Sequence, residues 1–157
     1  MLFMVQGFLA AGKSTLSRHL SELSGAAHLD ADAYCLETFS SHELIDWNSC
    51  FAAAVADLWK QAEGLILDRK SAILDYGFWT RASHDDARAE ATRLSVSLVH
   101  VFVQAPDETL LWRMEHRKGA VAESNVAAFH RLKLGFQPPE PDEEAIVIST
   151  CDGRSRH

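Results

Sequence analysis

Residues 7–15 read Gly-Phe-Leu-Ala-Ala-Gly-Lys-Ser-Thr. A glycine, four residues, a second glycine, a lysine and a hydroxyl residue form the spacing of a phosphate-binding loop. The flanking sequence fits, because residues 2–6 form a short apolar run that predicts a buried strand and residues 13–24 carry leucines at helical spacing. A glycine turn before an ordinary helix is the simpler alternative. The complete match at the first strand-to-helix turn favours the phosphate loop.

The chemistry of this loop follows from its backbone. Gly7 and Gly12 can adopt backbone angles closed to other residues and let the chain approach a ligand closely. Successive N–H groups and the start of the following helix then surround phosphate oxygens. Lys13 would reach the β- and γ-phosphates, and Ser14 would ligate Mg²⁺. The predicted nucleotide-binding residues of the loop are Gly7, Ala10, Ala11, Gly12, Lys13, Ser14 and Thr15. The motif thus predicts a nucleoside triphosphate ligand and leaves the phosphate acceptor open.

The composition is that of an ordinary globular chain. Its 157 residues suit one domain, and 47% of them are apolar. No apolar run approaches the roughly 20 residues of a membrane span. The N-terminus lacks the cationic flank and cleavage site of a signal peptide. We therefore expect a cytoplasmic protein without a membrane partner.

Charge and the metal-binding residue types argue against further classes of protein. The net charge of −7 argues against broad nucleic-acid binding. The three cysteines are far apart and odd in number, so they predict neither a disulfide framework nor a zinc pair. The eight histidines show no metal-ligand spacing.

Strand and helix patterns alternate along the chain. The predicted strands are residues 2–6, 27–29, 71–76, 96–103 and 146–149, and the predicted helices are residues 13–24, 48–62, 82–94, 106–117 and 121–134. Gly64 is the stop signal of the second helix, and residues 138–144 form an acidic, proline-rich loop. This alternation predicts a parallel sheet with helices on both faces, in which ligands sit at the carboxyl ends of the strands. We expect a single domain over residues 1–151 and a flexible tail at 152–157.

Acidic residues follow two of the predicted strands. Asp30 and Asp32 come after the strand at 27–29, beside the phosphate loop, and both are predicted to contact the substrate. A carboxylate there can take a proton from an attacking hydroxyl, and Asp32 is the favoured catalytic base. A helix cap or a turn is the structural alternative for both. Asp75 ends an apolar strand, where P-loop proteins hold the magnesium shell, so Ser14 and Asp75 are the predicted metal residues.

Aromatic and basic residues follow the third predicted strand. Phe78 and Trp79 are predicted to stack on a substrate ring, although aromatic residues at a sheet end more often pack in the core. Arg81 lies just beyond them and is predicted to bind an anionic part of the acceptor.

Two arginines lie four residues apart and therefore share a helix face. Arg113 is predicted to bind the nucleotide, and Arg117 is predicted to be catalytic by neutralising charge on the transferred phosphoryl group. Both would act when a lid around residues 113–125 closes. A helix C-terminus that carries cations favoured by its dipole is the alternative.

Several of these stretches together resemble one group of proteins. Residues 30–34 (Asp-Ala-Asp-Ala-Tyr), 73–81 (Ile-Leu-Asp-Tyr-Gly-Phe-Trp-Thr-Arg), 110–118 and 136–139 (Phe-Gln-Pro-Pro) supplement the phosphate loop. The chain resembles the small P-loop kinases related to zeta toxins and chloramphenicol phosphotransferase, and within them a bacterial group of predicted kinases with AAA-type ATP binding. Residues 73–81 look like that group's Leu-Asp-Phe-Gly-Phe-Trp-Ser-Arg, and residues 30–34 stand where its members have Ser-x-Asp-Glu-Trp.

The resemblance implies a fold, cofactors and a reaction. The fold is a three-layer α/β/α P-loop nucleoside triphosphate hydrolase fold with a five-stranded parallel sheet in the order 2-3-1-4-5. ATP and Mg²⁺ are the implied cofactors, Asp32 is the implied base and Arg117 lies on the implied lid helix. The γ-phosphate would pass to a hydroxyl of a small molecule, such as an antibiotic, a sugar or a nucleotide-like acceptor. Ala33 and Gln137 replace the glutamates of that group, which leaves the acceptor open.

Two alternative functions stand beside this one. The phosphate loop with Asp30-x-Asp32 also looks like shikimate kinase, but residues 75–79 lack the run of glycines that this family has after its third strand. A regulatory ATPase without a small acceptor would need the phosphate loop alone, and Asp32 and the arginines would then be structural.

Overall fold

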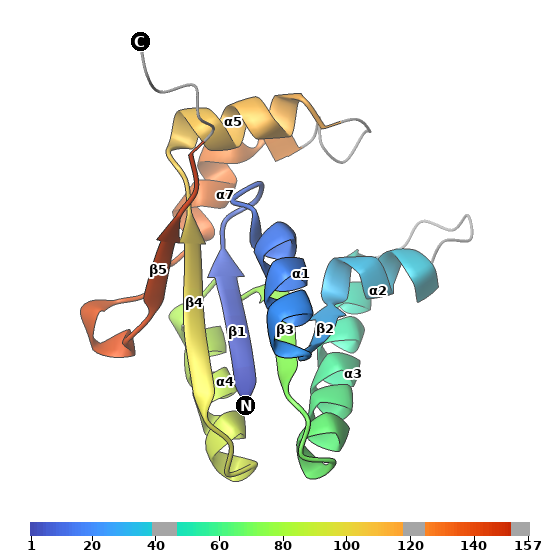
Figure 1. Cartoon of the computed structure of the whole chain (residues 1–157). Coiled ribbons are helices and arrows are strands. Elements are labelled where there is room, and N and C mark those ends of the chain that lie inside the picture. Colours follow the sequence, from blue (N-terminus) through green and yellow to red (C-terminus); the bar gives the residue numbers. More distant parts are fainter. Residues whose placement is uncertain (39–46, 118–124, 152–157) are drawn as a thin grey trace.

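The computed structural model describes residues 1–38, 47–117 and 125–151 (Figure 1). Five parallel strands form one sheet in the order β2-β3-β1-β4-β5, which confirms the predicted order. The strands are β1 (Leu2–Gly7), β2 (Ala27–Asp30), β3 (Ala72–Gly77), β4 (Leu98–Gln104) and β5 (Ile146–Ser149). All five carboxyl ends therefore lie at one edge of the sheet, where the phosphate loop follows the central strand β1.

Helices cover both faces of the sheet. They are α1 (Lys13–Ser24), α2 (Ala31–Thr38), α3 (Trp47–Leu67), α4 (Arg81–Arg93), α5 (Asp107–Glu115) and α7 (Phe129–Gly135), with a 3₁₀ turn η1 (Pro141–Glu143). Leu2 and Met4 of β1 belong to the apolar cluster that α3 and α4 complete. Phe3 and Val5 pack in a second cluster with α1, α5 and α7. Because alternate residues of a strand face opposite sides, the two clusters give the three-layer arrangement seen in Figure 1.

The long helix α3 corrects the expected stop at Gly64. The helix continues to Leu67, and the turn that ends it has Arg69 at φ 60° and a hydrogen bond of 2.8 Å from the Lys70 N–H to the Leu65 carbonyl. Leu65 packs against the buried cluster of α3 and α4. Its burial outweighs the cost of about 1 kcal/mol for a glycine inside a helix.

Other boundaries differ in ways that concern the site. Residues 31–38 were not among the predicted helices, but α2 begins at Ala31, directly after Asp30. Of the expected helix over 121–134, the described residues 125–127 are helical, residue 128 forms a turn, and α7 begins at Phe129. The predicted tail and residues 118–124 of the predicted lid lie outside the described residues. Among the helices that the structure describes, none is long and apolar enough to cross a bilayer.

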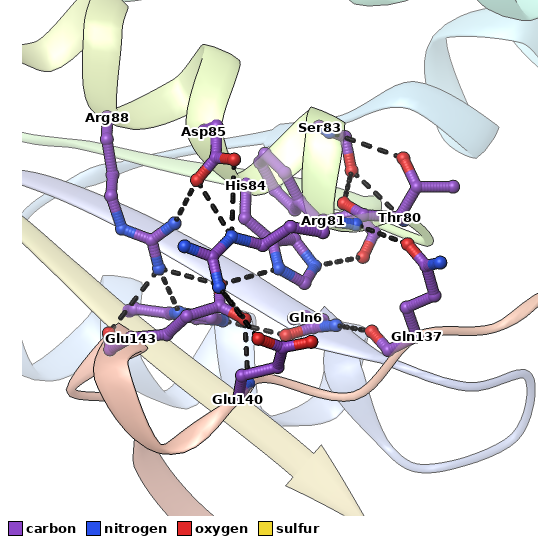
Figure 2. A network of polar contacts seen from close by, with 12 residues as sticks. Gln6, Thr80, Arg81, Ser83, His84, Asp85, Arg88, Gln137, Glu140 and Glu143 are labelled. Carbon is purple, nitrogen blue, oxygen red and sulfur yellow. Dashed lines mark hydrogen bonds and ion pairs between the residues drawn. The ribbon is translucent and has the colours of Figure 1, made fainter.

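A buried polar network fastens the acidic loop to α4 (Figure 2). Glu143 of η1 is 4% exposed, and its Oε1 accepts a hydrogen bond of 2.8 Å from Arg88 and lies 2.7 Å from His84 Nδ1. Its Oε2 accepts from the Glu140 N–H at 2.7 Å. Burial alone would raise the pKa of Glu143, but these hydrogen bonds outweigh it and lower the pKa. The buried carboxylate is thus held as an anion between two elements.

The same network reaches the strand that leads into the phosphate loop. Gln6 donates from Nε2 to the Gln137 carbonyl at 2.7 Å, and its Oε1 lies 2.8 Å from His100 Nε2. Burial lowers the pKa of His100 to about 4, so the ring is neutral at pH 7. Its Nε2–H therefore donates to Gln6, whose amide nitrogen is already a donor. Gln137 in this way ties the acidic loop to β1 one residue before Gly7.

Candidate nucleotide and phosphoryl-transfer site

The phosphate loop has the backbone that its sequence predicts. A Cβ at Gly7 would lie 2.5 Å from the Val103 carbonyl oxygen, so no side chain fits there. Gly12 has φ 105° directly before α1, and Ala10 has φ 62°, both in the left-handed region. Among the described residues no side chain caps the start of α1. The first N–H groups of the helix therefore remain available to an anion.

Charged side chains from several elements act on Lys13. Its ammonium donates to the Phe8 carbonyl at 3.2 Å, within the loop. Burial lowers the pKa of Lys13; the negative charges of Asp75 and Asp32 oppose this, and the positive charge of Arg117 adds to it. Residues from β3, α2 and the end of α5 thus share one electrostatic neighbourhood with the phosphate loop. No ion pair of Lys13 to a carboxylate occurs within the part of the chain that the structure describes.

The two aspartates after β2 have different roles. Asp30 Oδ1 accepts hydrogen bonds from the backbone N–H groups of Asp32 (2.9 Å) and Ala33 (3.1 Å), so Asp30 caps α2. Asp32 lies in the first turn of α2; the residue as a whole is exposed, but its carboxyl group is partly shielded from solvent. Burial of its carboxyl group and the nearby charge of Asp30 raise the pKa of Asp32, and Lys13 acts in the opposite direction. Asp30 is therefore a helix cap, which was the structural alternative to substrate binding. It also lies next to Asp32, the predicted base.

Asp75 lies in β3 and is 3% exposed. In the parallel register it pairs with Asp30 of β2. Its Oδ2 lies 3.1 Å from His28 Nε2. Ser14 opens the neighbouring helix, so a hydroxyl and a carboxylate oxygen are the donors near the phosphate loop. Oxygen donors of this kind suit Mg²⁺, and the chemistry of these residues fits the predicted metal site.

The two predicted lid arginines occupy different places. Arg113 donates from Nη1 to the Ala10 carbonyl (3.1 Å), the Ala11 carbonyl (3.4 Å) and Thr150 Oγ1 (3.0 Å). Thr150 in turn donates to the Ala11 carbonyl at 2.8 Å. In this conformation Arg113 holds the carbonyl side of the phosphate loop, while Arg117 acts electrostatically on Lys13. Sequence reasoning missed Thr150, because only the fold brings the end of β5 to the loop.

The three residues predicted to bind substrate after β3 lie in packed or paired positions. Phe78 is 1% exposed, and its ring lies against Tyr76 with centroids 3.8 Å apart, which corrects the expectation that it stacks on a substrate. Trp79 packs against Phe8 at 5.3 Å between ring centroids. Arg81 forms ion pairs with four carboxylates, Asp85, Glu140, Asp142 and Glu143. This network favours a structural role for Arg81 over its predicted contact with an acceptor.

A cleft of about 480 Å³ opens beside the phosphate loop. It lies between α1, β2, α2 and α3, and its wall includes Ser14, His28, Asp30, Tyr34 and Gln61. The wall combines hydroxyl, imidazole, carboxylate and amide groups, so it can form hydrogen bonds with a polar ligand. Of the residues predicted to bind substrate, only Asp30 belongs to this wall.

Comparisons with known proteins show which family model and which solved structures the chain resembles. A family model described as an AAA domain (AAA_33) matches residues 2–139. No curated protein matches the chain. Several solved structures share its fold. Kti12 of Chaetomium thermophilum in complex with ADP-AlF3 has a TM-score of 0.72 at 16% identity, covering 98% of this chain and 92% of that one. A sugar kinase from Janibacter sp. has a TM-score of 0.69 at 20% identity, covering 94% of this chain and 84% of that one. A gluconokinase from Sinorhizobium meliloti has a TM-score of 0.67 at 16% identity, covering 96% of this chain and 82% of that one.

Proposed function

The chain belongs to the AAA domain family AAA_33, and from this premise we propose that it is an ATP-dependent phosphotransferase that moves the γ-phosphate to a hydroxyl of a small molecule. One observation carries the proposal: the carboxylate of Asp32 lies in electrostatic range of the Lys13 ammonium, and the charge of Arg117 acts on both groups. A lysine, a carboxylate and an arginine gathered at a phosphate loop are what in-line phosphoryl transfer requires.

The proposed transfer assigns one task to each group. The N–H groups of the loop and Lys13 bind the phosphates, and Asp32 takes the proton from the acceptor hydroxyl as its oxygen attacks the γ-phosphorus. The bond from the γ-phosphorus to the bridging oxygen breaks, and ADP leaves. Arg117 neutralises charge on the phosphoryl group in flight. Ser14 and Asp75 would hold Mg²⁺, which would neutralise charge on the phosphate oxygens.

The environment of Asp32 supports its role as the base. A carboxylate with an ordinary pKa is a weak base at neutral pH, and a raised pKa brings it closer to the working pH. Burial and the neighbouring Asp30 supply that rise. Lys13 limits the rise, because it favours the ionised form that can accept a proton.

Two observations bear on the nature of the acceptor. The polar cleft beside Ser14 has room for a small hydroxylated compound. A sugar kinase and a gluconokinase share the fold of this chain, which favours an acceptor of that chemical class. Membership of the zeta toxin and chloramphenicol phosphotransferase group remains a prediction from the resemblance of residues 73–81.

The proposal is tested with a panel of sugars, sugar acids, nucleosides and hydroxylated antibiotics, each incubated with Mg²⁺ and ATP. We expect one class of acceptor to accelerate ADP release and to yield a phosphate ester detectable by mass spectrometry. With that acceptor, Asp32→Ala should lose about 10²–10⁴-fold in kcat and should keep its affinity for ATP. Asp86→Ala removes an exposed carboxylate of α4 and serves as the control. Equal turnover by Asp32→Ala and the wild type would disprove the role of Asp32.

A regulatory ATPase is the second candidate, and one observation favours it. Phe78, Trp79 and Arg81, which were predicted to bind an acceptor, are packed or ion-paired instead. If this candidate holds, no compound of the panel accelerates ADP release, and a protein partner does.

A further inference from the structure

The buried carboxylate of Asp75 depends on a neighbour that no sequence motif marks. Asp75 is 3% exposed, and an anion at such a position is costly unless hydrogen bonds satisfy it. The side-chain donor that meets it among the described residues is His28 Nε2, 3.1 Å from Oδ2. His28 is itself largely buried, with 17% of its side chain exposed.

The parallel register explains how His28 reaches this carboxylate. His28 pairs with Ile73 and Asp30 pairs with Asp75, so His28 and Asp75 are diagonal neighbours on adjacent strands. Polar atoms of His28, Asp30 and Asp75 all lie within 4.8 Å of one another. Asp30 Oδ1 is already an acceptor for two N–H groups of α2. The imidazole is therefore the donor of this trio, and the two carboxylates are acceptors.

We propose that His28 is a positioning residue for the metal site of Ser14 and Asp75, an inference that rests on the proposed function. By donating from Nε2 to Oδ2, the ring fixes the rotation of the Asp75 carboxylate. The other oxygen can then serve the cation or a water bound to it. His28 and Ser14 both line the cleft beside the phosphate loop, so the ring and the predicted metal ligand face the same space. Partners that orient metal ligands in this way commonly change metal affinity by 10–100-fold.

A direct test needs no acceptor. The full-length protein is titrated with Mg²⁺ at a fixed concentration of ADP, and nucleotide binding is followed by calorimetry; a parallel measurement in EDTA gives the affinity for metal-free ADP. We expect His28→Ala to raise the Mg²⁺ concentration for half-maximal binding by about ten-fold or more, with the affinity for metal-free ADP unchanged. His28→Gln, which can place an amide N–H near the same oxygen, should stay close to the wild type.

Two further variants make the test decisive. His28→Phe keeps a ring without a donor and should behave like His28→Ala, so the comparison with His28→Gln stands even if the alanine variant does not fold. His130→Ala removes an exposed histidine of α7 and should leave the Mg²⁺ titration unchanged.

The proposal is overturned if His28→Ala and His28→Phe titrate like the wild type, if they weaken metal-free and Mg²⁺-dependent binding of ADP equally, or if His28→Gln is as impaired as His28→Ala.

Failure of the proposed function gives a different result. A wild-type protein that binds ADP with Mg²⁺ but phosphorylates nothing would contradict the kinase assignment and leave the role of His28 intact. A wild type that binds no Mg²⁺ with ADP would overturn both.

Discussion

At the scale of single residues, Asp32 depends on its neighbours more than on its own position. It stands on the first turn of α2, beside Asp30 and in range of Lys13. The first neighbour raises its pKa and the second lowers it, so the two residues adjust the same carboxyl group in opposite directions. Sequence reasoning found both aspartates from their position after a strand. It could not tell the cap from the base, because the distinction depends on where the backbone N–H groups of α2 point.

Asp30→Asn should lower the pKa of Asp32 and move the acid limb of the rate profile. Asparagine still caps a helix, so the change removes the charge of Asp30 and keeps α2. A base works only when deprotonated; activity is therefore lost as the pH falls through the pKa of Asp32, and a lower pKa shifts this loss to lower pH. The measurements are kcat/KM against pH with the identified acceptor and a carbon-13 titration of the Asp32 carboxyl. An unmoved or raised pKa in Asp30→Asn would contradict the coupling.

At the scale of elements, the acidic loop and α4 are held together by charges. Arg81 Nη1 and Nη2 donate to the carboxylate of Asp142 at 3.0 and 2.9 Å. Glu143 accepts from Arg88, on the same helix as Arg81 (Figure 2). The partners lie 55–61 residues apart in sequence. From sequence alone, Arg81 near a strand end looked like an anion-binding residue, since nothing local reveals carboxylates that arrive from so far along the chain.

Glu143→Gln should destabilise the protein by about 3 kcal/mol at neutral pH, because it leaves the partly buried Arg88 and the buried His84 without their anionic partner. The folded-state pKa of Glu143 is lowered, so its stabilisation is complete above the unfolded-state pKa and is lost as the pH falls through the folded-state value. Urea unfolding at several pH values should therefore show the variant and the wild type converging in acid. Glu144→Gln changes the exposed neighbour and is the control. A difference that persists undiminished below the folded-state pKa would refute the linkage.

At the scale of the whole molecule, local sequence patterns were enough to predict the strands and helices of the sheet. Contacts that depend on the pairing register of the strands and on core packing could not be predicted from them. The parallel sheet followed from the alternation of apolar runs with helical segments, the strand order was implied by the family resemblance, and the structure confirms both. Helix α3 passes Gly64 because Leu65 finds a place in the core, and His28 meets Asp75 because β2 and β3 pair in a particular register. Neither outcome is visible until strands far apart in sequence lie side by side.

The central position of the phosphate loop makes nucleotide binding a test of the whole fold. The loop follows β1, which pairs with both β3 and β4, and a ligand that binds only the native state stabilises all of it. At 100 times its Kd, ADP with Mg²⁺ should add about 2.7 kcal/mol, or roughly 5–10 °C in Tm for a chain of this size. Lys13→Ala should abolish most of this shift, since the ammonium that balances the phosphate charge is gone, whereas Lys70→Ala, an exposed lysine before β3, should keep it. The measurement is a thermal unfolding series with and without ligand. An undiminished shift in Lys13→Ala would mean that the nucleotide binds away from the loop that follows β1. The proposed roles of Asp32, Asp75 and Arg117 would then be wrong, because all three assume a nucleotide bound at this loop.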